Sequence, residues 1–179
     1  MLPFLLTFLF GQESRGGFPY TIEKKIEASS NVIDMDAINI ERLLTEDENR
    51  PPATPFRYGY KFDVNLSLEN SGEWKVLDNG DRIWKLAIFS NDAYAICLEY
   101  NYFHLPNNST FYVYNEDASL IYGAYTNENN QEDMLFSTPL VEGELIYLEY
   151  YPLTLMNWRS LCLYHISVQL YQLLVARYQ

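Results

Sequence analysis

Histidine is nearly absent from this chain, which limits the catalytic chemistry that its side chains offer. Only His104 and His165 occur among the 179 residues. His104 lies in Phe103–Pro106 without an identifiable catalytic partner, so a strand-end residue bound to a backbone group is the simpler interpretation. No G-x-S-x-G sequence is present, and no serine is framed by glycines as an acyl-transfer nucleophile is. The sequence therefore predicts no catalytic residue.

Cysteine is equally scarce, with Cys97 and Cys162 as its two positions. A zinc site needs three or four clustered Cys, His or carboxylate ligands, and the cysteines and histidines here are scattered without short spacings. We therefore expect no zinc and no cofactor. Cys97 lies in the apolar run Tyr94–Leu98 and is expected to pack as a small buried hydrophobe. A disulfide to Cys162 is the alternative in an exported protein, because sequence does not define its geometry.

Basic residues are outnumbered by acidic ones. The chain has 12 Lys and Arg against 24 Asp and Glu, a net charge of −12. Nucleic acids and anionic membranes are polyanions that bind Lys and Arg patches. The charge balance therefore argues against both as partners and fits the surface of a soluble exported protein.

Long hydrophobic runs are missing as well. The uncharged apolar segment 1–12 is shorter than the roughly 20 residues that span a bilayer. It predicts the h-region of a truncated secretory signal peptide, with cleavage at Gly11–Gln12, and hence a secreted protein. The basic n-region of such signals is absent, so a buried N-terminal strand is the alternative.

Aromatic residues, by contrast, are abundant and favour strands. They make up 16% of a chain that is 48% hydrophobic, which is typical of a folded protein. In residues 72–89, two alternating runs flank Asp78–Asp81. Asn79–Gly80 between such runs predicts a β-hairpin with a type I′ turn. The alternation directs both Trp74 and Trp84 toward the core.

Strand-like alternation continues outside this hairpin. Further strands are predicted at 60–68, Ala93–Tyr100, Thr110–Tyr114, Leu120–Tyr125 and Leu145–Tyr150. Because no crossover helices separate them, the spacing predicts an all-β fold, an antiparallel β-sandwich of jelly-roll type over 56–152. Residues 13–55 are expected to form an irregular N-terminal arm and linker, with one or two helical turns in Ile38–Leu44. Residues 153–179 lack alternation and are interpreted as an aberrant tail with a candidate helix at Ser160–Tyr178.

An oxygen-rich loop at residues 126–133 raises the question of calcium. It carries Glu128, Asn130 and Asp133, and calcium takes six to eight hard oxygen ligands. The EF-hand pattern is absent, however, and acidic loops are commonly just solvated. The three residues are therefore calcium candidates beside the simpler interpretation of a solvated loop.

The tyrosines suggest a second type of site. Alternation places Phe111 and Val113 on one face of a strand, and Tyr112 and Tyr114 on the other. Exposed tyrosines make stacking platforms for sugars or peptides, while buried ones belong to the framework. Tyr112 and Tyr114 are therefore candidate platform residues, with a framework role as the alternative.

Several stretches taken together resemble a known family. They are Gly72–Ile88; Phe103–Pro106 with Thr110–Asp117; and Gly123–Asn130 through Ser137–Glu144 to Glu149–Pro152. The order and residue pattern of these stretches resemble the N-terminal, non-catalytic region of secreted bacterial trypsin-like serine proteases of the lysyl-endopeptidase type. The lead-in Gly16–Pro19 is similar to those exported precursors, and the likeness covers residues 13–152.

The resemblance implies a pro-region or accessory β-domain whose partner is the protease domain downstream in a full-length precursor. The family's catalytic triad lies downstream of this region, so no catalytic residue carries over. The chain departs from the family after Tyr151–Pro152, and a reading-frame shift near residue 153 is our hypothesis for Leu153–Gln179. The alternative function is a secreted module that binds carbohydrate or a cell surface.

Overall fold

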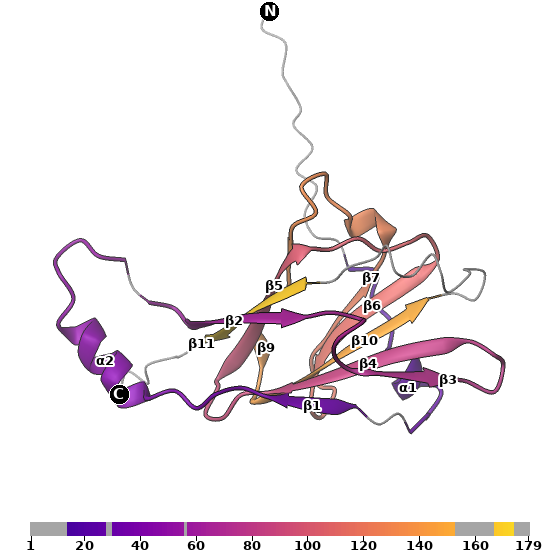
Figure 1. Ribbon diagram of the computed structural model, residues 1–179, viewed down its shortest axis with the longest axis horizontal. Helices are drawn as coiled ribbons and strands as arrows, with labels where there is room; N and C mark the ends of the chain where they lie inside the picture. Colours follow the sequence, from indigo (N-terminus) through magenta and orange to yellow (C-terminus); the bar gives the residue numbers. More distant parts are fainter. Residues whose placement is uncertain (1–13, 28–29, 56, 153–166, 174–179) are drawn as a thin grey trace, which may run out of the picture.

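The computed structural model describes residues 14–27, 30–55 and 57–152, together with the backbone of 167–173. Figure 1 shows its elements, which are α1 (Tyr20–Glu23), β1 (Asn31–Asp34), α2 (Ile40–Glu48), β2 (Tyr60–Leu66), β3 (Glu73–Val76), β4 (Arg82–Phe89), β5 (Ala95–Tyr102), β6 (Ser109–Asn115), β7 (Ile121–Tyr125), η1 (Asn127–Asn129), β8 (Phe136–Ser137), β9 (Val141–Glu142), β10 (Leu145–Pro152) and β11 (Ser167–Leu173). Strands predominate, and the predicted all-β class is confirmed. The predicted signal segment 1–12 lies outside the described residues.

The strands form two sheets. The first has the order β1–β4–β10–β6–β7, with β3 pairing with β4 as well. The second has the order β2–β11–β5–β8, with β9 also on β5. All pairs are antiparallel except β1 with β4, which run parallel. The exception arises because the N-terminal arm supplies β1, a strand that the prediction did not include.

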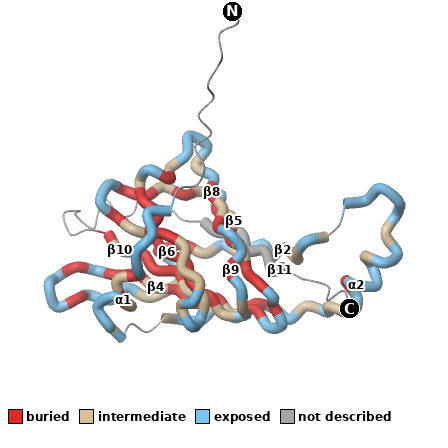
Figure 2. Tube along the Cα trace, turned by 180° about the vertical axis from the view of Figure 1, so that it is seen from behind, coloured by how far each residue is buried: buried red, intermediate tan, exposed pale blue. Residues whose placement is uncertain are grey.

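The two sheets share one hydrophobic core. Figure 2 shows the concentration of buried residues along the central strands. The first sheet contributes Trp84, Leu86, Val113 and Leu148, and the second contributes Ile96, Leu98, Tyr100 and Phe136. Alternation along each strand aims these side chains at the opposite sheet. In β2, Phe62, Val64 and Leu66 line the same core, as predicted.

The hairpin of β3 and β4 is confirmed, with Trp74 opposite Trp84. Trp84 is 2% exposed and shares the core with Leu86 and Ile88. Trp74 points to the same face, as predicted, and its ring lies edge-on to the buried Tyr150 ring at 6.1 Å, but Trp74 is 38% exposed. It lies on a four-residue strand at the sheet edge, where it donates from Nε1 to Leu68 O at 3.1 Å.

The turn of this hairpin differs from the predicted type I′. Gly80 N donates to Leu77 O at 2.9 Å, and Leu77 N donates to Asp81 O at 2.8 Å. Gly80 has φ of 86°, while Asn79 is not in the positive-φ region. The loop is therefore three residues long and ends in a left-handed glycine, the other common way to join twisted strands.

The C-terminal segment contradicts the predicted helix at Ser160–Tyr178. Residues 167–173 form β11, which pairs antiparallel with both β2 and β5. An apolar run without alternation fits a strand inside a sheet as well as a helix, and periodicity alone does not separate the two. Leu145–Pro152 is consequently not the last strand of the fold. The origin of the tail by a frame shift remains a hypothesis.

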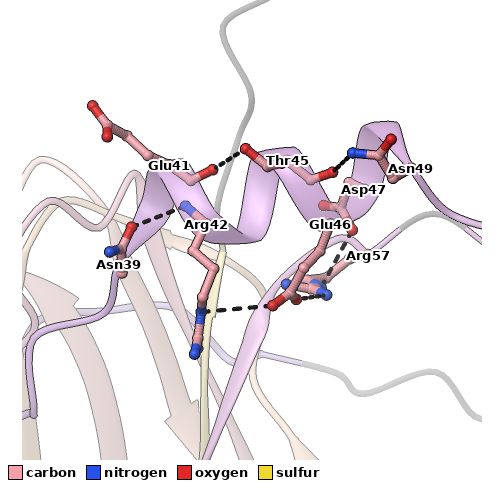
Figure 3. Close-up of polar contacts among 8 residues, drawn as sticks. All are labelled: Asn39, Glu41, Arg42, Thr45, Glu46, Asp47, Asn49 and Arg57. Atoms are coloured by element: carbon pink, nitrogen blue, oxygen red, sulfur yellow. Dashed lines mark hydrogen bonds and ion pairs between the residues drawn. The ribbon is translucent and has the colours of Figure 1, made fainter.

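The arm of residues 35–59 carries helix α2, which begins two residues after the start of the helical turns predicted at Ile38–Leu44 and ends four residues beyond them. Asn39 caps the helix by accepting from Arg42 N at 2.9 Å, the usual role of asparagine at this position. Arg57 returns to the helix and pairs with Glu46 and Asp47 at 2.9 and 3.5 Å (Figure 3). The stretch after Leu44, which was expected to be irregular, therefore begins inside a helix. Within the described ranges, no helix is long and apolar enough to cross a membrane.

The buried tyrosines predict alkaline unfolding. Burial raises the pKa of Tyr125 to about 12, and burial also raises the pKa of Tyr100 well above its ordinary value. An unfolded tyrosine loses its proton near pH 10. The contribution of the neutral phenol to the free energy of unfolding is therefore complete below pH 10 and is lost as pH rises through 12. Tyr125 alone contributes on the order of 2 kcal/mol. Urea unfolding at pH 8, 10 and 11.5 measures this loss. Tyr125→Phe should flatten the dependence, and an unchanged profile would contradict the assignment.

Candidate functional site

Residues 14–27 cross the face of the first sheet that points away from the shared core; we call this segment the strap. At one end, Gly16 N donates to Gly123 O at 2.9 Å and Ala124 N donates to Gly16 O at 3.0 Å, both on β7. At the other end, Lys75 Nζ of β3 donates to Glu27 O. The strap therefore reaches from one edge of the sheet to the other before the chain enters β1 (Figure 1).

Beneath the strap, sheet register aligns three polar side chains. Glu149 of β10 is paired with Lys85 of β4 on one side and with Tyr112 of β6 on the other. Residues opposite one another on neighbouring strands point to the same face. A carboxylate, an ammonium group and a phenol therefore lie side by side on the face that the strap covers.

Glu149 holds the strap directly. Its Oε1 accepts from Thr21 N at 3.0 Å, and its Oε2 accepts a short hydrogen bond from Thr21 Oγ1. Tyr114 Oη donates to the same Oε2 at 3.3 Å. Glu149 is 1% exposed, so these bonds replace the water that a buried carboxylate loses.

Lys85 lies over the tyrosine rings of this cluster. Its Nζ is 4.5 Å from the ring centre of Tyr147 and 5.7 Å from that of Tyr114, within cation–π range. Burial lowers the pKa of Lys85, and the charge of Glu149 opposes part of that shift. Burial and the same carboxylate raise the pKa of Tyr114. The phenol is therefore held as a proton donor to Glu149.

A second contact fixes the strap at α1. The rings of Tyr20 and Tyr151 stack with centroids 4.5 Å apart. Tyr151 Oη in turn donates to Asp81 Oδ2, and Asp81 is 8% exposed. Burial and Asp81 raise the pKa of Tyr151. Adjacent strap residues, Tyr20 and Thr21, thus occupy two specific positions on the sheet.

Glu149, Tyr112 and Tyr114 are enclosed, and this arrangement suits them to bind a segment of the chain. Tyr112 is 8% and Tyr114 3% exposed, and Ile22 of the strap packs against both. Glu149 already accepts from three donors. A substrate gains access to this carboxylate only when the strap moves away.

Loss of the Glu149 carboxylate should weaken the fold markedly. Glu149→Ala leaves Thr21 N, Thr21 Oγ1 and Tyr114 Oη without their acceptor, at about 1–3 kcal/mol for the buried groups together. Urea unfolding measures the change. Glu149→Gln is the matched control, because it keeps the oxygen that accepts from Thr21 N and should cost less. Equal losses for the two variants would contradict this role of the hydrogen bonds.

The two tyrosines of the candidate platform lie on the expected face of β6, where they are enclosed as the framework interpretation requires. Tyr112 and Tyr114 do point away from Phe111 and Val113, which lie in the shared core. The strap covers them, and Tyr112 Oη donates to Gly16 O at 3.4 Å. Alternation along one strand carries no information about a segment that arrives from 90 residues away.

The three calcium candidates each have partners within the protein. Asn130 uses its amide on the backbone of Leu105, accepting from N and donating to O at 2.8 Å each. Glu128 pairs with Arg15 of the strap, and Asp133 accepts from Leu135 N at 3.0 Å. No group of three or more His, Cys, Asp or Glu suited to a metal occurs in the described ranges.

The rare residues occupy ordinary positions. Cys97 is partly buried and donates from Sγ to Thr138 O at 3.3 Å, and burial raises the pKa of its thiol. The prediction of a packed cysteine is therefore met in part. His104 is half-buried. Cys162 and His165 lie outside the described residues, so the disulfide alternative stays a prediction.

Sequence analysis missed Glu149 and Thr21. The available signal was a carboxylate inside the otherwise apolar run Leu145–Pro152, on the face that alternation assigns to solvent. Such a residue is interpreted as a surface charge unless another segment of the chain covers that face.

Comparison with protein-family models, with curated proteins and with solved structures finds no match for this chain.

Proposed function

We propose that this chain is the non-catalytic N-terminal region of a secreted trypsin-like serine endopeptidase precursor, ending before the protease domain. Its fold is then an antiparallel β-sandwich of jelly-roll type, and its partner is the protease domain. The observation that carries the proposal is the use of Glu149. The most buried carboxylate of the first sheet holds a segment of its own chain and does not face a substrate cleft.

Two further features support a role without catalysis. Both sheets contribute to one aromatic core, which is what a sandwich requires. Of the side chains that might have served chemistry, Tyr114 packs in the cluster that Ile22 of the strap contacts, and Lys85 lies over the Tyr114 ring. The resemblance to the lysyl-endopeptidase type supplies the particular family and the secreted location.

Two measurements test the proposal. Purified chain should give no turnover of a lysyl ester, and the gene downstream should encode a protease domain in one of the other two frames. Refolding that protease domain with this chain added in trans should raise the yield of folded domain or inhibit its activity. Turnover by the chain alone, or the absence of a protease in every frame, would refute the proposal.

A second candidate is a carbohydrate- or cell-surface-binding module. It is favoured by the stacked rings of Tyr114 and Tyr147, 5.5 Å apart at their centroids, beside Tyr112. Aromatic rings of this kind stack on sugars once exposed. Calorimetry against a glycan and peptide panel tests the candidate. Saturable binding that is lost in Tyr112→Ala would favour it over the first proposal.

A further inference from the structure

The strap has two halves that meet at a pair of lysines. The docked half lies on the face of the first sheet, and the anchored half continues into β1. The contacts of Gly16, Tyr20 and Thr21 with the first sheet all precede Lys24. After Lys25, the chain runs on through Glu27 into β1, which is hydrogen-bonded into the sheet edge. A break between the halves would leave the docked part attached by noncovalent contacts alone.

Lys24 and Lys25 form the single pair of adjacent basic residues in the sequence. Both are exposed, and the side chain of Lys24 is 50% exposed and pairs with Glu23. They occupy the turn after α1, where Lys25 has φ of 54°, a left-handed conformation that a side chain disfavours. A short turn with exposed basic side chains and a strained residue opens locally at low cost.

The other basic residues of the described ranges are less accessible to a protease. Lys61, Lys75, Arg82 and Lys85 lie within strands, and Arg42 lies within α2. Arg50 precedes Pro51, and Arg57 is held by ion pairs to α2. Arg15 lies where the strap pairs with β7.

We propose that the Lys24–Lys25 turn is a processing site at which an endopeptidase specific for Lys or Arg releases the strap and opens the face around Glu149. Water adds across the peptide bond after Lys25, which leaves a carboxylate on Lys25 and a new ammonium group on Ile26. The site stands on the geometry of the turn. We also assign this cut to the protease of the full-length precursor, and that assignment rests on the proposed function.

Cleavage changes the strength of docking while the contacts of Gly16, Tyr20 and Thr21 with the sheet stay available. In the intact chain, the tether holds the strap at an effective concentration in the millimolar range. After the cut, the segment that ends at Lys25 binds as a separate peptide, and at micromolar protein it dissociates unless its affinity is high. Glu149, Tyr112 and Tyr114 then face solvent as one acidic and aromatic surface.

The test uses the full chain under native conditions with a trace of a trypsin-like endopeptidase. Mass spectrometry and N-terminal sequencing follow the products with time. We expect new N-termini at Lys25 or Ile26, formed on the order of 10-fold faster than cuts after Arg42, Arg57 or Lys61, because cleavage follows local opening. Lys24→Gln/Lys25→Gln should abolish this product, whereas the control Arg42→Gln/Lys61→Gln should keep it.

Tyrosine nitration with tetranitromethane, followed by peptide mapping, reports whether the face opens. In intact chain and in the Lys24→Gln/Lys25→Gln variant, Tyr112 and Tyr114 should resist nitration, and in the nicked chain they should react. Faster cutting at Arg57 or Lys61 than at Lys25 overturns the processing site. A nicked chain whose Tyr112 and Tyr114 stay unreactive overturns strap release. Neither outcome bears on lysyl-ester turnover or on the downstream gene, so each failure is separate from that of the proposed function.

Discussion

Trp84→Ala is expected to lower the free energy of unfolding by about 3–5 kcal/mol, the usual loss for removing a large core aromatic. Trp84 is 2% exposed, and its Nε1 donates to Ser71 O at 2.8 Å. Truncation removes this hydrogen bond and opens a cavity beside Leu86 and Ile88, which belong to the same core. Urea unfolding followed by circular dichroism measures the loss.

Trp74→Ala is the matched control, because Trp74 lies directly opposite Trp84 on the same hairpin. Its side chain is 38% exposed and has one hydrogen bond, to Leu68 O. Its truncation should cost about 1–2 kcal/mol, nearer to a surface change. If the two variants lose the same stability, the difference in burial between the edge strand β3 and its neighbour β4 does not determine the loss.

Removal of residues 153–179 is expected to have an even larger effect. In the second sheet, β11 pairs with β2 along one side and with β5 along the other. A chain that ends at Pro152 leaves β2 without its neighbour and exposes an edge of β5, which invites aggregation. We expect the melting temperature to fall by more than about 10 °C, since each kcal/mol shifts it by roughly 2–4 °C at this length.

A chain that ends at Leu174 is the control for this truncation, because it keeps all of β11 and removes only the residues beyond it. It should melt close to the full chain. If the chain that ends at Pro152 also melts at the same temperature, β11 contributes nothing to the fold. That result would favour the interpretation of 153–179 as an aberrant tail produced by a frame shift.

The local elements of this protein follow from its amino-acid sequence alone. Two-residue alternation specified β2, β4, β6 and β10 and their inner faces, because side chains of a strand alternate between its two sides. Asn79–Gly80 located the hairpin turn but not its type. The type follows from the length of the loop, and this length depends on the twist of the two paired strands.

The segment that covers the outer face of the first sheet, in contrast, is evident only from the three-dimensional structure. Glu149 alternates like a surface residue and is buried because Thr21, distant in sequence, supplies two hydrogen bonds. Tyr112 and Tyr114 are enclosed for the same reason. Likewise, the run that forms β11 became a strand because β2 and β5 each present an unpaired edge to it. Periodicity is a property of one segment, whereas burial and edge pairing depend on a second segment that periodicity does not identify.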